Sequence, residues 1–332
     1  MKLFGNIELI DLAIYADETL IFTDFHIGYE EALNKQGMLI PRFQFDEIIK
    51  RLESIFKKLK NKRIEKIIIN GDLKHEFGTI SEQEWRHTLR LLDYFGRHCK
   101  EIILVKGNHD TILGPIAKKR NVKVVEHYLI EPIKQSTIGS NPINNKKTII
   151  KNTLKNKKIS ISQKSLISGN LENSKNFQSI KKSFKKININ NKIEKILKNK
   201  KISIINKSNK KYSIIEKSNK KIINKNKILV LHGNSIPNKE LLKGVSTIII
   251  GHEHPAVSVR EGPRAELFKA YLIGKWKGKN LIAQPSFNLV TEGTDMLKEE
   301  VLSPFLKQNL GNFDVVVVAD KMYRFGKLGE LE

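Results

Sequence analysis

The sequence is short of cysteine and of long apolar runs. Cys99 is the one cysteine among 332 residues, which excludes a disulfide framework and a zinc site built from cysteines. No apolar run approaches the ~20 residues that a membrane-spanning helix needs. The start, MKLFGNIELIDLAIYADE, reaches charged residues too early for a signal peptide. We therefore expect a cytoplasmic protein with no membrane partner.

Arginine, aspartate and aromatic residues are scarce in one segment, residues 135–227. It contains no Arg, no Asp and three aromatic residues, Phe177, Phe184 and Tyr212. Its 25 lysines face three glutamates, so it carries +22 of the net charge of +25. A decamer, ISIINKSNKK, is followed at once by its near copy YSIIEKSNKK over residues 202–221. This Lys/Asn/Ile-rich, low-complexity composition predicts a largely disordered insertion, with short isoleucine-rich strands as the alternative.

The insertion divides the chain into three ranges. We expect the first part of a folded domain at 1–134, the insertion at 135–227, and the second part of the same domain at 228–332. Outside the insertion the net charge is only +3, so the basic character of the chain belongs to the insertion. Two explanations stay open: drift of an AT-rich coding sequence in a tolerated surface loop, or a polybasic arm that contacts nucleic-acid phosphates.

Both flanking parts show the alternation of an α/β fold. Apolar, β-rich runs predict strands, and apolar stripes at helical spacing predict amphipathic helices between them. Strands are expected at 19–24, 66–72, 101–108, 122–127, 227–233, 246–252 and 313–320. One helix is expected from Pro41 to Leu59, with the proline at its first position, and another from Trp85 to Phe95. We assign these apolar stripes to the core.

Five of the predicted strands end in side chains that can bind a metal ion. The residues are Asp24 and His26, Asn70 and Asp72, Asn108 with His109 and Asp110, His232, and His252 with His254. In an open α/β sheet, side chains just beyond the carboxyl ends of the strands converge on a shared crevice. A lone His-x-His is common on protein surfaces, but five such strand ends in one chain predict a single site.

The types of donor in this set limit the chemistry. Imidazole with carboxylate suits Mn, Fe, Zn or Ni better than Ca or Mg, whose ligands are mostly oxygen. The set is too large for one tetrahedral zinc ion. Two divalent ions bridged by a carboxylate would use all of it, hold a phosphate and activate a water between them. The residues therefore predict a dinuclear site for phosphate-ester chemistry.

The motifs DFHIG, GDLKH, GNHD, the single His232 and GHEH, in this order, resemble those of the calcineurin-like metallophosphoesterases. The resemblance covers residues 1 to about 134 and about 227 to 320. It implies an α/β fold, a four-layer αββα sandwich that the insertion interrupts. It also implies a hydrolase of phosphate ester bonds with two metal ions at the strand ends.

Carried over motif by motif, the resemblance gives each residue a role. Asp24, His26, Asp72 and His254 would hold one metal ion. Asp72, Asn108, His232 and His252 would hold the other, so that Asp72 bridges the pair. His109 would stabilise the substrate phosphate and protonate the leaving oxygen. Asp110 would orient His109 through a hydrogen bond.

A finer resemblance is to the archaeal ICC-like branch related to the nuclease subunit of SbcCD. It extends to the bacterial ligase-associated DNA-damage-response endonuclease. NGDLKHEFG, GHEHPAVSVR and GKWKGKNLIAQPSFNLVTEGTD carry it. It implies a Mn²⁺-dependent nuclease (Fe, Ni or Zn as alternatives) that cuts single-stranded DNA in repair, beside a helicase and a ligase. Related enzymes often pair through a two-fold interface, which would make the chain a homodimer.

The ligand set leaves the substrate open. A small-nucleotide phosphatase or cyclic phosphodiesterase would present the same phosphate to the same metals, and the near-neutral folded part favours such a substrate or a partner that presents DNA. A non-catalytic scaffold of the same fold is a third hypothesis, against which the complete ligand set argues. The chain departs from the family pattern at His75, where many members have Asp or Glu. His75 either supports a metal ligand or is purely structural.

Two expectations concern the surface. Arg260 and Arg264 would lie near the site, either as solvated charges or as contacts to substrate phosphate. The stretch GKWKGK at 274–279 would form a hairpin turn with an exposed Trp276, and contact with nucleic acid is the alternative.

Overall fold

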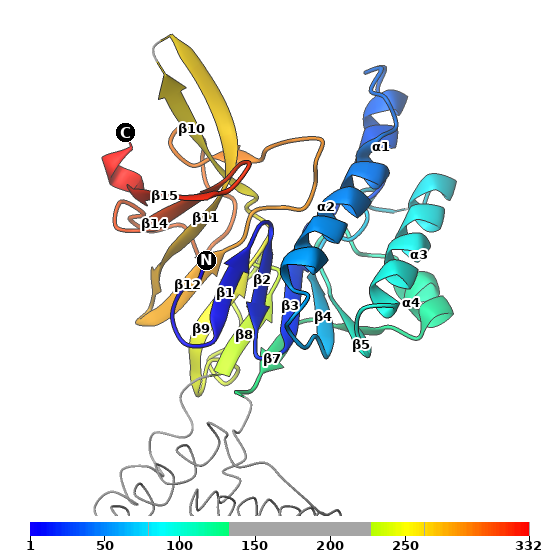
Figure 1. Ribbon diagram of the computed structural model, residues 1–332, viewed down its shortest axis with the longest axis horizontal. Coiled ribbons are helices and arrows are strands. Elements are labelled where there is room, and N and C mark those ends of the chain that lie inside the picture. The colour runs from blue at the N-terminus through cyan, green and yellow to red at the C-terminus, as the bar shows by residue number, and fades with distance from the viewer. Residues whose placement is uncertain (79, 133–226, 262, 332) are drawn as a thin grey trace, which may run out of the picture. The chain divides into compact units, whose positions relative to one another are not determined.

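The computed structural model describes residues 1–78, 80–132, 227–261 and 263–331. The predicted insertion and its expected disorder lie outside the described residues, so the division of the chain at 134/135 and 227/228 stays a prediction. The described parts on either side belong to one compact unit. That unit is built from two mixed β-sheets and a set of helices (Figure 1), which confirms the α/β class.

The first sheet has six strands in the order β1-β2-β3-β4-β5-β6. They are β1 (Ile7–Ile10), β2 (Ala13–Ala16), β3 (Thr19–Thr23), β4 (Lys66–Asn70), β5 (Glu101–Val105) and β6 (Lys123–Val125). β1 to β3 form an antiparallel meander, whereas β3 to β6 run parallel. The strands predicted at 19–24, 66–72 and 101–108 are confirmed. The run predicted at 122–127 ends early, and the chain then enters the second sheet as β7 (Tyr128–Ile130).

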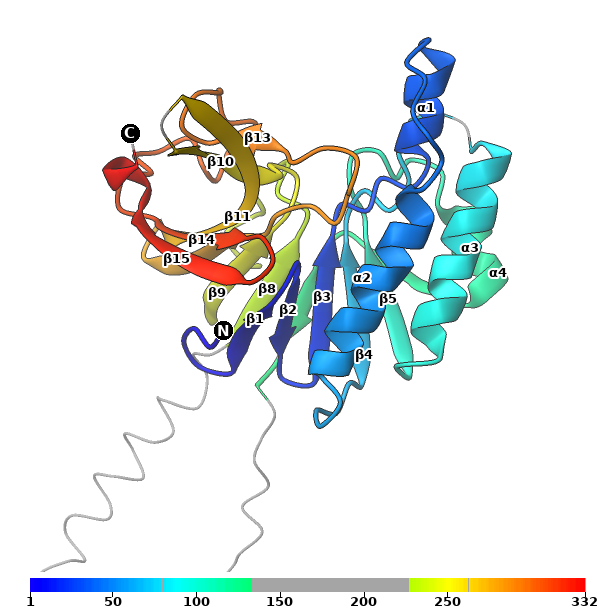
Figure 2. The same cartoon turned by 45° about the horizontal axis from the view of Figure 1, so that its top comes forward.

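The α-helices of the described part of the chain all lie between residues 29 and 120. They are α1 (Tyr29–Lys35), α2 (Gln44–Lys58), α3 (Glu82–Gly96) and α4 (Gly114–Arg120). Both views place α2 and α3 on the same side of the first sheet (Figures 1 and 2). Ile48 and Leu52 of α2 share a buried core with Phe95 of α3 and Phe22 of β3, as the apolar stripes predict.

The start of α2 differs from the prediction. The helix begins at Gln44 and not at Pro41. The buried carboxylate of Glu30, in α1, accepts hydrogen bonds from the backbone N–H groups of Phe43 and Gln44 at 3.1 and 3.0 Å. The first N–H groups of a helix have no partner within the helix, so a carboxylate from α1 fixes where α2 starts. α3 begins with a capping box formed by Ser81 and Glu84.

The second sheet has nine strands. The order β13-β10-β11-β12-β9-β8-β7 is extended by β14, which pairs with β11 and β15. The new strands are β8 (Lys227–Leu231), β9 (Val245–Ile250), β10 (Pro255–Glu261), β11 (Arg264–Trp276), β12 (Lys279–Ala283), β13 (Thr294–Asp295), β14 (Asp314–Val318) and β15 (Met322–Lys327). A short 3₁₀ helix, η1 (Leu328–Glu330), follows. The strands predicted at 227–233, 246–252 and 313–320 are confirmed.

Two surface expectations need correction here. The hairpin turn at 276–279 is present, but Trp276 is buried at 5% exposure and packs on Phe305. Arg260 and Arg264 stand at the tip of the β10–β11 hairpin. Because a strand rises ~3.3 Å per residue, Arg260 lies well away from His254, which directly precedes β10.

Successive residues of β8 and β9 point into different cores, since side chains alternate across a strand. Ile228, Val230 and Ile249 pack in the core shared with the first sheet. Leu229 and Leu231 pack in a second core with Phe305 and other residues that follow β12. The described residues therefore have no helical layer outside the second sheet, and the predicted four-layer αββα arrangement is corrected. The second core on that side is closed by the stretch 296–313, from which Met296, Phe305 and Phe313 are buried.

The two sheets meet at the carboxyl ends of their parallel strands. The buried amide of Asn70, at the end of β4, donates to the backbone carbonyl of Leu231, at the end of β8, at 3.0 Å. Phe287 N–H donates to the carbonyl of Thr23, at the end of β3, at 2.9 Å. These links bring the ends of β3, β4 and β8 together, which is where the sequence predicts a site.

Candidate metal centre

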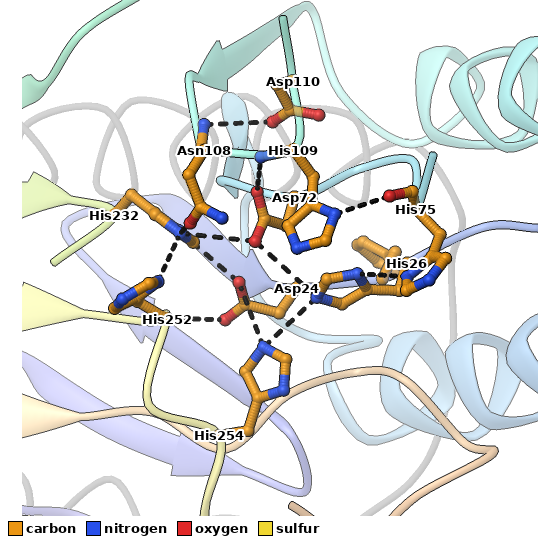
Figure 3. Close-up of polar contacts among 12 residues, drawn as sticks. Asp24, His26, Asp72, His75, Asn108, His109, Asp110, His232, His252 and His254 are labelled. Atoms are coloured by element: carbon orange, nitrogen blue, oxygen red, sulfur yellow. Dashed lines mark hydrogen bonds and ion pairs between the residues drawn. The ribbon is translucent and has the colours of Figure 1, made fainter. Parts of the chain in front are cut away.

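The side chains predicted to bind metal converge at this edge, from both parts of the chain (Figure 3). Asp24, His26 and His254 have ligand atoms that all lie within 4.8 Å of one another. Asp72, His232 and His252 form a second such group. Asp24, Asp72 and His232 are at most 2% exposed. The two groups correspond to the two predicted ligand sets.

The first group is held together by close approaches of nitrogen and oxygen atoms. Nε2 of His26 lies 3.3 Å from Nε2 of His254. Nε2 of His254 lies 3.5 Å from Oδ1 of Asp24, and Nε2 of His26 lies 3.7 Å from Oδ2 of Asp72. These distances place four donor atoms around one point, and they come from His26, His254, Asp24 and Asp72.

The second group adds an amide oxygen. Nε2 of His232 lies 2.9 Å from Oδ1 of Asn108, 3.1 Å from Nδ1 of His252 and 3.4 Å from Oδ2 of Asp72. Oδ2 of Asp72 thus faces both groups, whereas its Oδ1 accepts a hydrogen bond from the backbone N–H of His109 at 2.8 Å. A single carboxylate oxygen lies where the two groups meet.

Five residues of these groups have left-handed backbone conformations. These residues are Asp24, His26, Asp72, His252 and His254, and their φ angles lie between 43° and 64°. Each non-glycine residue held in this region costs of order 1–3 kcal/mol and persists only where surrounding contacts impose it. The strain aims each side chain back toward the shared centre as the chain leaves its strand.

Two glycines give the cluster its room. A Cβ on Gly71, whose φ is +84°, would lie 2.0 Å from Nδ1 of His232. A Cβ on Gly107 would lie 2.1 Å from Oδ1 of Asp72. Any side chain at either position would occupy the place of a predicted ligand, so both positions need glycine.

The electrostatics of the cluster keep its carboxylates charged. Burial lowers the pKa of His232, but the hydrogen bond to Asp72 and the charge of Asp24 outweigh it and raise the pKa to about 9. Burial opposes ionisation of Asp72, yet His232 holds its pKa below the usual range. Burial, with the charge of His232, lowers the pKa of His252 to about 4. Anionic carboxylates and a neutral His252, the forms that bind metals, are thereby favoured, whereas His232 must lose its proton when a metal ion binds.

The residues fit a pair of divalent cations. Oδ1 of Asp24 is buried and has no hydrogen-bond partner, although a buried carboxylate oxygen without a partner is costly. Its neighbours at 3.5 Å are imidazole nitrogens of His232 and His254, so a cation is the partner it lacks. A nitrogen- and oxygen-containing set without sulfur suits Mn, Fe, Zn or Ni.

Residues 18–256 match the family model described as calcineurin-like phosphoesterase. The chain belongs to this family. It is a metallophosphoesterase, a hydrolase of phosphate esters, with buried His/Asp groups that can bind metal. No curated protein matches the sequence.

Two solved structures resemble this phosphoesterase distantly. A nuclease, MPE from Pseudomonas putida, has 14% identity and a TM-score of 0.44, over 96% of this chain and 93% of the nuclease. A Vps29 single mutant from Entamoeba histolytica has 14% identity and a TM-score of 0.27, over 92% of this chain and 97% of Vps29. No helix in the described ranges is long and apolar enough to cross a membrane.

The ring of His109 is held differently from the prediction. Its Nδ1 lies 2.5 Å from the backbone carbonyl oxygen of His75. A carbonyl only accepts, so Nδ1 carries the proton and Nε2 is left facing the cluster (Figure 3). The carboxylate of Asp110 instead accepts from the backbone N–H groups of Leu73 and Gly107, both at 3.1 Å.

The hydrogen bond predicted between Asp110 and the His109 ring is therefore corrected. Asp110 braces the loops that carry Asp72 and Asn108, because both of its oxygens are used by backbone amides of those loops. Burial and the charge of Asp72 raise the pKa of Asp110 to about 7.

His75 lies beside a predicted ligand. Its Nδ1 is 3.2 Å from Nδ1 of His26, and burial lowers its pKa to about 4. Nδ1 of a neutral His75 can accept a hydrogen bond from Nδ1–H of His26, which leaves the lone pair of Nε2 of His26 directed toward the cluster. The side chain of His75 thus orients His26 while its carbonyl orients His109.

Two neighbours of the cluster escaped the sequence analysis. Lys74 is fully buried, and its ammonium donates to the backbone carbonyls of His109, at 2.8 Å, and Glu76. Phe77 is half-exposed, and its ring centre lies 3.7 Å from that of His109. Lys74 lies within the GDLKH motif and Phe77 lies two residues after it, but nothing in the type of either residue shows which loop it will contact.

Proposed function

We propose that this metallophosphoesterase is a dinuclear phosphodiesterase that cuts DNA, single-stranded DNA in particular, with Mn²⁺ as its metal. The position of Oδ2 of Asp72 between the two ligand groups carries the dinuclear part of the proposal. The finer resemblance of NGDLKHEFG and GHEHPAVSVR to the repair nucleases supports DNA as the substrate. It also makes a helicase and a ligase candidate partners, and a homodimer a candidate assembly.

Each predicted ligand keeps its role in this proposal. Asp24, His26, Asp72 and His254 hold one ion, and Asp72, Asn108, His232 and His252 hold the other. The pair of ions, when bound, supplies Lewis-acid activation of the phosphoryl group and of the attacking water.

The protein's own contribution is centred on His109. With Nδ1 committed to the His75 carbonyl, Nε2 of the protonated ring donates to the phosphate and passes its proton to the leaving oxygen. Three contacts fix the position of His109. Asp72 accepts a hydrogen bond from its backbone N–H, and Lys74 donates one to its backbone carbonyl oxygen. The ring of Phe77 packs against its imidazole. Asp110 acts as a positioning residue for these loops and not as a partner of the ring.

A small-nucleotide phosphodiesterase is the second candidate. The net charge of only +3 outside residues 135–227 favours it, because proteins that grip long nucleic acids neutralise many phosphates. A non-catalytic scaffold is disfavoured, since all seven predicted ligands are present and meet in two groups.

A DNA-nicking gel with a parallel chromogenic assay distinguishes these functions. The protein, with Mn²⁺ or with a chelator, is incubated with circular single-stranded DNA, beside a His109→Ala control and a parallel tube of bis-p-nitrophenyl phosphate. Metal-dependent nicking of the circle that His109→Ala abolishes is the expected result. Turnover of the small ester with an untouched circle would move the assignment to small nucleotides. No reaction in either tube, with two metals bound, would point to a scaffold.

A further inference from the structure

A groove of about 450 Å³ adjoins the second ligand group. Asn108 and His232, two of the predicted ligands, are among the residues that line this groove. The remaining walls come from the loop after β5, the turn between β6 and β7, and residues 234–241 after β8. A phosphate held at the cluster therefore has this groove beside one of its ester substituents.

The lining of the groove combines polar and apolar groups. Asn234, Ser235 and Asn238 supply amides and a hydroxyl, while Pro237 and Leu241 supply apolar surface. Oδ1 of Asn238 accepts from the backbone N–H of Leu241 at 2.9 Å, so its amide NH₂ remains for a ligand. Such a mixture of donors, acceptors and apolar surface suits a base and sugar.

The charges of the groove argue against a second phosphate there. Lys106 is paired with Glu126 at 3.7 Å, so the lysine does not stand as an uncompensated cation. The volume lies at the low end of the ~300–1,000 Å³ range of small-molecule sites, which suits one nucleoside better than a run of several.

We propose that this groove binds a nucleoside that flanks the scissile phosphate. Asn234 and Asn238 contribute hydrogen bonds to the nucleoside, and the groove determines that the substrate is a nucleotide ester and not an arbitrary phosphodiester. The inference rests on the proposed phosphodiesterase function and adds the substrate class of the same site. It holds for DNA and for small nucleotides alike, because both present a nucleoside next to the phosphate.

The test compares two esters with the same leaving group. One is the p-nitrophenyl ester of thymidine monophosphate, and the other is methyl p-nitrophenyl phosphate, which lacks the nucleoside. Full-length protein with Mn²⁺ is assayed as wild type, Asn234→Ala and Asn238→Asp, and the last change keeps the oxygen that accepts from Leu241. Asn61→Ala is the matched control, since Asn61 is exposed in the turn after α2, before β4 begins.

We expect the wild type to prefer the nucleoside ester by about tenfold or more in kcat/KM. Each groove variant should lose about five- to tenfold on that ester, the loss of one or two hydrogen bonds. The same variants should leave the methyl ester unchanged, and Asn61→Ala should match the wild type on both. Binding of thymidine alone, measured by titration calorimetry, should weaken in the groove variants.

Two results would overturn the inference in distinguishable ways. Equal hydrolysis of both esters, unaffected by the groove variants, would remove the nucleoside site and leave the phosphodiesterase proposal standing. No hydrolysis of either ester by metal-loaded wild type would overturn the proposed function, and the inference with it.

Discussion

Asp72 and His109 are joined by a hydrogen bond from the backbone N–H of His109 to Oδ1 of Asp72 at 2.8 Å. The other oxygen of Asp72 faces both ligand groups. The residue proposed to bridge the metals thus also sets the backbone position of the residue proposed to protonate the leaving group. Because the bond uses the backbone of His109, its side chain can be removed without releasing Asp72.

His109→Ala should therefore separate catalysis from metal binding. We expect kcat to fall by about 10²-fold or more, since general acid catalysis contributes that much, while the metal content of the purified protein stays at the wild-type level. Steady-state kinetics and elemental analysis measure the two effects. His98→Ala is the control, because the ring of His98 packs on Phe56 and not on a predicted ligand. Near-normal turnover with loss of metal would refute the assigned role.

His75→Ala should weaken metal binding and leave catalysis by the metal-loaded enzyme intact. The backbone carbonyl that orients His109 remains, but the imidazole beside Nδ1 of His26 is lost. We expect metal affinity to fall about 10–100-fold, as for other groups that orient a ligand, and kcat to recover at saturating Mn²⁺. Metal titration followed by activity detects this, with His87→Ala as the control. A defect that excess metal does not relieve would contradict the prediction.

Gly107→Ala should damage the site through sterics alone. The added Cβ would lie 2.1 Å from Oδ1 and 2.4 Å from the backbone nitrogen of Asp72. We expect a loss of about 1–3 kcal/mol in the free energy of unfolding, typical of overpacking, and poor metal binding. Gly96→Ala, at the end of α3, has nothing within 4 Å of its Cβ and should be neutral or slightly stabilising. Denaturant melts of both variants make the comparison.

Lys269 should make stability depend on pH in an unusual direction. Its buried ammonium donates to Ser286, Thr291 and Glu292, and burial lowers its pKa from 10.5 to about 7. Between these values the unfolded chain binds more protons than the folded one, so the group's contribution to the free energy of unfolding rises with pH.

The variant Lys269→Met removes this dependence. The stability of the wild type minus that of the variant should increase from pH 7 toward pH 10, by at most about 1.4 kcal/mol per pH unit. Below pH 7 the difference should be flat, because both states are protonated. Lys275→Met, an exposed position on the same strand, should show no such trend. A difference that stays flat from pH 7 to pH 10 would mean that Lys269 remains protonated in the folded protein.

Removal of residues 133–226 should leave a folded enzyme. β7 and β8 pair antiparallel with Ile130 opposite Ile228, so a short Asn-Gly turn can join them. Insoluble protein would contradict this expectation. If the basic segment binds nucleic acid, its removal should also flatten the dependence of DNA affinity on salt. An unchanged slope would favour drift as its origin.

Much of the candidate site was predictable because its signals are local. Apolar runs marked β3, β4, β5, β8 and β9, and each predicted ligand directly follows one of these strands. The contacts of Asp110 and His75 were not predictable, because each depends on a loop from another part of the chain. The resemblance led to a wrong hydrogen bond for Asp110, whose oxygens are taken by backbone amides.

The sequence by itself determined the positions of the strands that carry the predicted ligands, the chemical types of those ligands and the family, since periodicity and motif spacing are properties of short stretches. Tertiary structure decided which oxygen of Asp72 faces both groups, which carbonyl holds His109, and that no helix covers the second sheet in the described ranges. It also decided that five ligands adopt left-handed backbone conformations. Such strain exists only where contacts between distant segments impose it, so no short stretch of sequence encodes it.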